Sequence, residues 1–308
     1  MNRFIRYWNQ NRKKIIITIA IIAFIFLLTR LLNYIAKNNN ESGEDKQIID
    51  VSKPIQSVIT GEQVSAEITD KNTQIIRQFI NYCNESEYTS AYELLTDECK
   101  EQVFNNNINL FISNYCESIF KTKKISEIDL WLSLNNTYTY KVKFYEDNLL
   151  STGGSQMSSN KEDYITVNKD KLSINEFINK KEINKSLKEK DIEIIINSKL
   201  VYKDYETYNI TINNHSSKSI MISTGENSKD ICLIDENKAE YPSFIHEILA
   251  SNLSLQSGYQ KNINIRFNKV YDIYRRVEQI KFGNIILDEE QYKRKESNIE
   301  TTTIIIDI

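Results

Sequence analysis

The pattern of apolar and polar residues divides the chain into one continuous apolar run, a part with helical periodicity and a part with strand periodicity. Residues 15–32 form the apolar run, in which thirteen of eighteen residues are Ile, Leu or Phe. Extended to residue 36, this run would span about 30 Å as a helix, which is enough to cross a bilayer. Arg30 lies near its end, where a long side chain can reach the lipid headgroups. The pattern therefore predicts a transmembrane helix over residues 15–36.

The charges on the two sides of this run predict its orientation. Residues 1–14 carry five Arg or Lys and no acid, whereas residues 37–50 carry two lysines and four acids. Because positively charged flanks stay on the cytoplasmic side, we expect a short cytoplasmic N-terminal tail and extracellular C-terminal domains. A cleaved signal peptide is the alternative, but cleavage after the nearest small residue, Ala36, would place bulky Tyr34 at the −3 position, which makes a poor cleavage site. The sequence favours an uncleaved signal-anchor at the cell membrane.

Helical periodicity begins after a polar stretch, residues 37–68, which is predicted to be a linker. Asn72 is a suitable capping residue, and apolar residues then recur on one helical face through Ile76 and Phe79. A second broad apolar stripe covers residues 107–120 and is typical of a helix packed on a sheet.

The period changes from 3.6 to 2 near Ile128, which indicates that strands begin there. Apolar residues alternate over 128–134 and again over 138–144, after a turn at Asn135-Asn136. A second hairpin is predicted to pair residues 164–168 with residues 172–174 across Lys169-Asp170.

Helices followed by antiparallel strands resemble the NTF2-like cone fold. The residues that carry the resemblance are IIRQFINYCNESEYTSAYELLTDECKEQVF, which read as a first helix, a short gap and a second helix of the form sAYeLLt. The resemblance covers about residues 70–177, although only four strands are evident. It implies an α+β cone whose interior can be filled or can hold a ligand.

The last part of the chain has strand periodicity throughout. A charged segment, NKKEINKSLKEK, is predicted to be a connector, and seven or so short strands with turn residues between them follow. The segments YNITINNHSSKSI and LQSGYQKNINIRF resemble the immunoglobulin-like modules of bacterial surface proteins. The Cys…Trp…Cys arrangement of antibody domains is absent. We expect an antiparallel β-sandwich.

The predicted fold class is α+β, with an N-terminal transmembrane helix, an NTF2-like α+β cone and an all-β immunoglobulin-like sandwich. The expected boundaries are 1–14 for the tail, 15–36 for the transmembrane helix, 37–68 for the linker, 69–178 for the NTF2-like domain, 179–190 for the connector and 191–308 for the immunoglobulin-like domain.

Composition and motifs argue against several classes of function. The net charge of −3 provides no basic footprint for nucleic acid. The chain has no Walker loop, and its two histidines, His215 and His246, have no cysteine or second histidine at ligand spacing. We therefore predict no catalytic, cofactor-binding or metal-binding residues and no cofactor.

The NTF2-like resemblance supplies one catalytic hypothesis, because some members are isomerases or dehydratases with an acid and a tyrosine inside the cone. The candidates here would be Asp129 or Glu127 with Tyr138 or Tyr140. Both acids alternate away from the apolar strand face, so we expect them on a solvated face, with the tyrosines in the core or lining a ligand site. An isomerase-like activity is therefore the least favoured hypothesis.

Four cysteines, Cys83, Cys99, Cys116 and Cys232, leave a disulfide open in an exported chain. Their spacing favours buried thiols, since Cys83 and Cys116 each share a helical face with apolar residues. If one bridge forms, Cys83 to Cys99 is the expected pair.

An anchor followed by an NTF2-like domain resembles the assembly factors of conjugative type IV secretion systems in Gram-positive bacteria, which scaffold a channel through protein contacts. Those relatives more often carry a second NTF2-like domain, where this chain has a sandwich. The resemblance implies a non-enzymatic adaptor or scaffold in the bacterial cell envelope, with the membrane and other envelope proteins as its partners. An envelope sensor that binds a small ligand in the cone is the alternative.

Overall fold

The computed structural model describes residues 55–134, 136–146, 161–269 and 276–308. The predicted tail, the predicted transmembrane helix over 15–36 and the linker up to residue 54 lie outside these described residues. Within the described ranges, no helix is long and apolar enough to cross a membrane. The described chain combines helices and strands and is mostly β, which confirms the mixed class that the sequence predicted.

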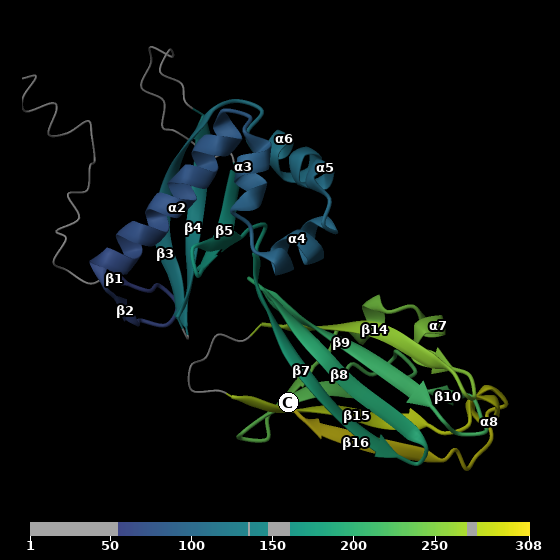
Figure 1. Ribbon diagram of the computed structural model, residues 1–308. Coiled ribbons are helices and arrows are strands. Elements are labelled where there is room, and N and C mark those ends of the chain that lie inside the picture. Colours follow the sequence, from purple (N-terminus) through teal and green to yellow (C-terminus); the bar gives the residue numbers. More distant parts are fainter. Residues whose placement is uncertain (1–54, 135, 147–160, 270–275) are drawn as a thin grey trace, which may run out of the picture. The chain divides into compact units, whose positions relative to one another are not determined.

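The first region packs a set of helices against one face of a four-stranded antiparallel sheet with the order β3-β4-β5-β6 (Figure 1). A short hairpin, β1–β2, precedes it. Its elements are β1 (Ile55–Gln56), β2 (Gln63–Val64), α2 (Ala66–Asn84), α3 (Tyr88–Glu93), α4 (Asp97–Phe104), α5 (Ile108–Phe111), the π-helix η1 (Ile112–Cys116), α6 (Glu117–Ile119), β3 (Lys124–Leu134), β4 (Thr137–Glu146), β5 (Lys161–Asn168) and β6 (Lys171–Ser173).

Local signals explain most of these boundaries, with one correction. Helix α2 begins at Ala66 and not near Asn72, because the Ser65 hydroxyl caps it by accepting a hydrogen bond from the backbone of Ile68. Residues 55–68, the end of the predicted linker, thus carry β1, β2 and the first turn of α2. Asn72 is instead a buried residue within the helix.

The second region consists of two antiparallel sheets that share one core (Figure 1). One sheet has the order β14-β9-β8-β7, and the other has the order β12-β11-β15-β10-β13 with β16 paired to β15. The elements are β7 (Phe177–Glu189), β8 (Ile192–Tyr202), β9 (Tyr205–Asn214), β10 (Ile220–Met221), β11 (Ile231–Asp235), β12 (Glu240–Pro242), the 3₁₀-helix η2 (Ile245–Glu247), α7 (Ala250–Leu253), β13 (Ser254–Leu255), β14 (Gln260–Asn268), β15 (Val277–Ile286), α8 (Glu289–Lys293) and β16 (Thr301–Asp307).

The expected connector over 179–190 is corrected by the structure, because nearly all of it belongs to β7. This strand pairs with β8 along its length, through a hairpin whose turn residues Lys190 and Asp191 both have positive φ. Backbone pairing, and not burial of its mostly exposed side chains, therefore holds β7 in place. A lysine-rich edge strand of this kind also discourages unwanted strand pairing.

Each region has its own apolar core. In the first region the core lies between the helices and the sheet and includes Phe79, Phe111 and Tyr140. In the second region the inward residues of both sheets meet, with Ile194, Tyr208 and Phe282 among them. The apolar residues that alternate along the predicted strands are the residues that fill these cores.

All four cysteines are buried free thiols, so the predicted burial is confirmed. The sulfur atoms that approach each other are those of Cys83 and Cys116, at 4.0 Å. The expected partner for a bridge, Cys99, is therefore not the nearest candidate. Burial raises the pKa of Cys99 from 9.0 to about 12 and that of Cys232 from 9.0 to about 11.

We expect these thiols to resist modification in the native protein. For Cys99, the raised pKa alone lowers the reactive thiolate population about 1,000-fold. Titration with a thiol reagent should show very slow labelling at neutral pH and rapid labelling of all four cysteines in denaturant without reductant. Release of only two thiols in denaturant would contradict this expectation and indicate a Cys83–Cys116 bridge.

Candidate functional site

The acids and tyrosines of the isomerase hypothesis lie on opposite faces of the first sheet. Tyr140 is fully buried, and its hydroxyl oxygen accepts a hydrogen bond of 3.1 Å from the side chain of Asn72. Glu127 and Asp129 are exposed on the other face, where Lys143 Nζ lies 3.0 Å and 3.8 Å from their carboxylates. The predicted solvated position of both acids is therefore confirmed, and the structure does not bring them to Tyr140.

The two candidate tyrosines belong to the core. Tyr138 is half-buried and packs against the core that contains Tyr140. Burial raises the pKa of Tyr140 to about 12, although the hydrogen bond from Asn72 opposes this rise. Tyr140 is buried, protonated and hydrogen-bonded to the Asn72 amide, so we assign it a structural role.

Replacing Tyr140 by phenylalanine tests that role. We expect Tyr140→Phe to lower the free energy of unfolding by about 1 to 2 kcal/mol, because the buried Asn72 amide loses its acceptor. Urea denaturation followed by circular dichroism would measure the loss. A change in binding of a partner, with stability unaltered, would contradict the structural role.

The first region also contains a buried acid, Asp163, that the sequence analysis did not single out. The Tyr115 hydroxyl donates a hydrogen bond of 2.6 Å to it. Three backbone N–H groups, those of Tyr164, Asn175 and Glu176, donate at 2.7, 2.9 and 3.0 Å. Burial raises the pKa of Asp163, and these four donors oppose the rise.

These contacts give Asp163 a structural role. It lies on β5 and receives hydrogen bonds from the turn after β6, in which Asn175 and Glu176 both have positive φ. The two carboxylate oxygens of Asp163 therefore connect β5, the turn after β6 and the helical Tyr115 through hydrogen bonds. Residues 163–167 are all buried, so strand alternation could not distinguish this acid from its neighbours.

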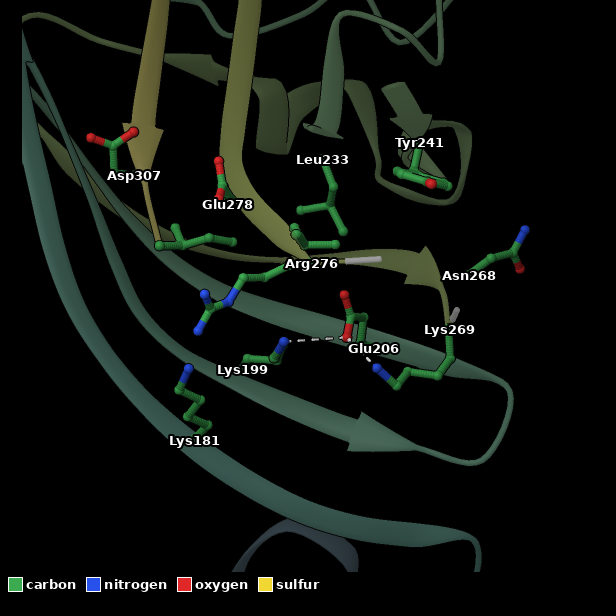
Figure 2. Close-up of a pocket in the computed structure, with 12 residues that line it drawn as sticks. Lys181, Lys199, Glu206, Leu233, Tyr241, Asn268, Lys269, Arg276, Glu278 and Asp307 are labelled. Atoms are coloured by element: carbon green, nitrogen blue, oxygen red, sulfur yellow. Dashed lines mark hydrogen bonds and ion pairs between the residues drawn. The ribbon is translucent and has the colours of Figure 1, made fainter. Parts of the chain in front are cut away.

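A cleft of about 670 Å³ lies at one end of the second region and is lined by residues of both sheets (Figure 2). Four of its lining residues are cations: Lys181 on β7, Lys199 on β8, and Lys269 and Arg276 at the ends of β14 and β15. We call this the cationic cleft. Three acids, Glu206, Glu278 and Asp307, also line it.

A single buried carboxylate, Glu206, is shared between two of these cations. Lys199 Nζ and Lys269 Nζ lie 3.5 Å and 3.4 Å from Glu206 Oε2. The Tyr208 hydroxyl donates to the other oxygen at 3.2 Å. Burial lowers the pKa of Lys269, while the nearby Glu206 carboxylate opposes this effect. The two lysines therefore share one buried carboxylate.

Lys181 and Arg276 contribute two further positive charges to the lining of the cleft. Within the described part of the chain, neither side chain forms an ion pair or a hydrogen bond that would compensate its charge. Lys181 is directly opposite Lys199 in the β7–β8 pairing, so two like charges face each other across the strands. Figure 2 shows the charged ends of Lys181, Lys199 and Arg276 pointing toward the same space. This arrangement can receive an anionic group.

Strand periodicity does not reveal this site, for a physical reason. Ile192, Ile194 and Ile196 alternate inward, so continued alternation would place Lys199 outside the sandwich. A bulge between Ile196 and Ser198 shifts the register by one residue and brings Lys199 opposite the buried Tyr208. The cations also come from four separate places in the chain, and only the tertiary fold brings them together.

The two histidines do not form a site. His215 Nε2 lies 3.5 Å from a Glu193 carboxylate oxygen, and the His246 ring packs against Phe244 at 5.9 Å between centroids. Among the residues that the structure describes, no cluster of three or more His, Cys, Asp or Glu side chains could hold a metal ion.

No protein-family model and no curated protein matches this chain. Three solved structures are similar to part of it. They are the yjhA protein from Bacillus subtilis (15% identity, 41% of this chain and 96% of that one, TM-score 0.27), a protein of unknown function from Listeria monocytogenes (11%, 43% and 85%, 0.28) and a conserved hypothetical protein from Bacillus anthracis (13%, 40% and 95%, 0.25). At these TM-scores the similarities identify neither a fold family nor a function.

Proposed function

We propose that this chain is a non-enzymatic adaptor of the bacterial cell envelope that binds a partner protein through the cationic cleft. It would be held at the membrane by the helix expected over residues 15–36, with its NTF2-like and immunoglobulin-like domains outside the cell. The observation that carries the proposal is the pair of cations, Lys181 and Arg276, which line the cleft and form no ion pair among the described residues. Uncompensated charge in a concave site favours recognition of an oppositely charged partner.

The interior of the first region supports binding over catalysis. Its centre is filled by packed side chains such as Phe79, Phe111 and Tyr140. The buried acid Asp163 already accepts four hydrogen bonds. A general acid or base needs a proton that a substrate can reach, and Asp163 is committed to its neighbours. The same packing argues against a small ligand in this interior.

Crosslinking tests the adaptor role. The full-length protein would be crosslinked in cells and purified from detergent-solubilised membranes, and its partners would be identified by mass spectrometry. The variant Lys181→Glu/Arg276→Glu reverses the two uncompensated charges. The control Lys185→Glu/Arg294→Glu makes the same charge change at exposed positions away from the cleft.

We expect the wild type, the control and Tyr140→Phe to recover the same envelope proteins, and the cleft variant to lose most of that recovery. Recovery of no other envelope protein by the wild type would overturn the adaptor role. Equal recovery by the cleft variant would overturn the assignment of the cleft as the binding site.

A further inference from the structure

A second cleft in the same region, of about 560 Å³, presents an exposed aromatic side chain. Tyr259 lines this cleft and is 62% exposed. Its backbone is held in place, because its N–H donates to the Gln256 carbonyl at 3.2 Å and its own carbonyl accepts from the Asn214 N–H at 3.0 Å. Gly258 forms the turn before it with a φ of 75°. We call this the Tyr259 cleft, and its aromatic ring is open to a ligand.

The charged residues of the Tyr259 cleft are bonded within the protein. Lys261 Nζ donates to the carbonyl oxygens of Ser251 and Ser254, at 2.7 and 2.9 Å. Glu289 is buried, and its Oε1 lies 3.0 Å from Lys293 Nζ. The Ser254 hydroxyl donates to Glu289 Oε2 at 2.6 Å. An ionic ligand would have to compete with these contacts, so the cleft suits a neutral ligand.

Side-chain amides continue from this cleft onto the outer face of the sheet β14-β9-β8-β7 (Figure 1). Gln260 lines the cleft and begins β14, on which Asn262 and Asn264 alternate with the inward Ile263 and Ile265. The outward residues that adjoin them on β9 and β8 are Asn209, Thr211, Asn213 and Asn197. We call this set of outward residues the amide face.

Hydrogen bonds fix the orientation of these amides. Asn197 Nδ2 donates to Asn209 Oδ1, and Asn209 Nδ2 donates to Asn264 Oδ1, each at 2.8 Å. The Thr211 hydroxyl donates to Asn262 Oδ1, also at 2.8 Å. Within the described ranges, no residue accepts a hydrogen bond from the Nδ2 of Asn262 or Asn264. Two oriented amide donors are therefore available to a ligand.

A solvated surface is the alternative explanation of the amide face, and the first sheet shows such a surface in the same chain. Its exposed face holds ion pairs, with Lys143 at 3.0 Å from Glu127 and Lys141 at 2.8 Å from Glu162. Asparagine is also disfavoured in strands. Residues that break a local preference are typical of functional sites. Ordered amides on three neighbouring strands, next to an exposed tyrosine, therefore favour a binding face.

We infer that the Tyr259 cleft and the amide face together bind a neutral glycan chain, with a sugar ring stacked on Tyr259 and hydroxyl groups hydrogen-bonded to Asn262 and Asn264. A pyranose ring has an apolar face that packs on an aromatic ring, and its hydroxyl groups both donate and accept hydrogen bonds. Such a site is separate from the cationic cleft and adds a second binding activity to the adaptor role proposed above.

Binding of soluble hexasaccharides tests the inference. The probes are chitohexaose, which carries acetamido groups, and cellohexaose, which carries hydroxyl groups alone. Isothermal titration calorimetry would use the full-length protein in a polyoxyethylene detergent, because a sugar headgroup would compete. We expect at least one probe to bind with a Kd of about 1 mM or below. Binding of one probe alone would support the inference and identify the class of sugar.

Variants locate the binding. We expect Tyr259→Ala to weaken it at least about 10-fold, whereas Tyr259→Phe keeps the ring and should retain it. The variant Asn262→Ala/Asn264→Ala should weaken it about 5-fold or more, through two lost hydrogen bonds. Tyr145→Ala, at a partly exposed tyrosine of the first region, is the matched control and should have no effect. Since Tyr259 is mostly exposed, Tyr259→Ala should keep the wild-type melting temperature.

Three results would overturn the inference. The first is absence of binding of both hexasaccharides. The second is binding that Tyr259→Ala and Asn262→Ala/Asn264→Ala leave unchanged. The third is binding that weakens steeply with salt, because a neutral ligand should be insensitive to ionic strength. Lys181→Glu/Arg276→Glu should bind the probe as the wild type does, even where its crosslinked partners are lost, so glycan binding and the adaptor role can fail separately.

Discussion

Replacing Asp163 by alanine should lower the free energy of unfolding by about 3 to 5 kcal/mol, because each buried donor left without a partner costs about 1 to 3 kcal/mol. Four donors would lose their acceptor: the Tyr115 hydroxyl and the backbone N–H groups of Tyr164, Asn175 and Glu176. The effect should be larger than that of an ordinary core truncation of the same size, since the loss also frees the turn after β6.

Urea denaturation followed by circular dichroism measures this effect. Glu162→Ala is the matched control, because it removes an exposed carboxylate on the preceding residue that lies 2.8 Å from Lys141. Such a surface pair contributes about 0 to 1 kcal/mol. Tyr115→Phe removes one donor of the four and should cost less than Asp163→Ala. A loss below about 1 kcal/mol for Asp163→Ala would contradict the structural role.

The elements that the sequence predicted correctly are those with strong local signals. The alternation over 128–134 and 138–144 became β3 and β4, in which Leu130 faces Tyr140. The hairpin across Lys169-Asp170 became β5–β6, and both turn residues have positive φ, as a tight two-residue connection requires. The apolar stripe over 107–120 became α5, η1 and α6 in succession. Periodicity and turn residues determine these elements without help from the rest of the chain.

The elements that the sequence missed depend on tertiary pairing. Residues 179–190 have the composition of a connector, yet β8 beside them supplies a complete set of backbone partners. Helix α2 starts six residues before Asn72, because a serine at position 65 is an equally good cap. Residues 179–190 and the start of α2 are each compatible with two local structures. Tertiary pairing and packing determine which one forms, and the local sequence does not contain this information.

The candidate sites were harder to predict than the fold. Asp163 lies in a run of buried residues in which the acid has no distinguishing period. Lys199 faces inward only because of a bulge in β8. Acidic and basic residues are interspersed along the whole sequence, and charged residues in such a pattern are usually exposed to solvent. Burial of a charge is a property of the folded arrangement, and periodicity contains no information about it.

The second large effect is expected at Glu206, which should be the most costly single change in the second region. Glu206→Ala leaves Lys199 and Lys269 next to each other, both largely buried, without the carboxylate that compensates them. Removing one partner of a buried ion pair destabilises a protein by about 3 to 5 kcal/mol. The Tyr208 hydroxyl also loses its acceptor.

A double-mutant cycle separates uncompensated charge from lost packing. If repulsion between the two lysines causes the loss, Glu206→Ala/Lys269→Met should be more stable than Glu206→Ala by about 1 to 3 kcal/mol. Asp204→Ala is the control, because this exposed acid precedes the same strand and its described ion pair is with Lys203, at 3.4 Å. Denaturation of the wild type, Glu206→Ala, Lys269→Met and the double variant gives the coupling free energy between Glu206 and Lys269. If Lys269→Met fails to restore stability, packing and not charge compensation by Glu206 stabilises this end of the sandwich.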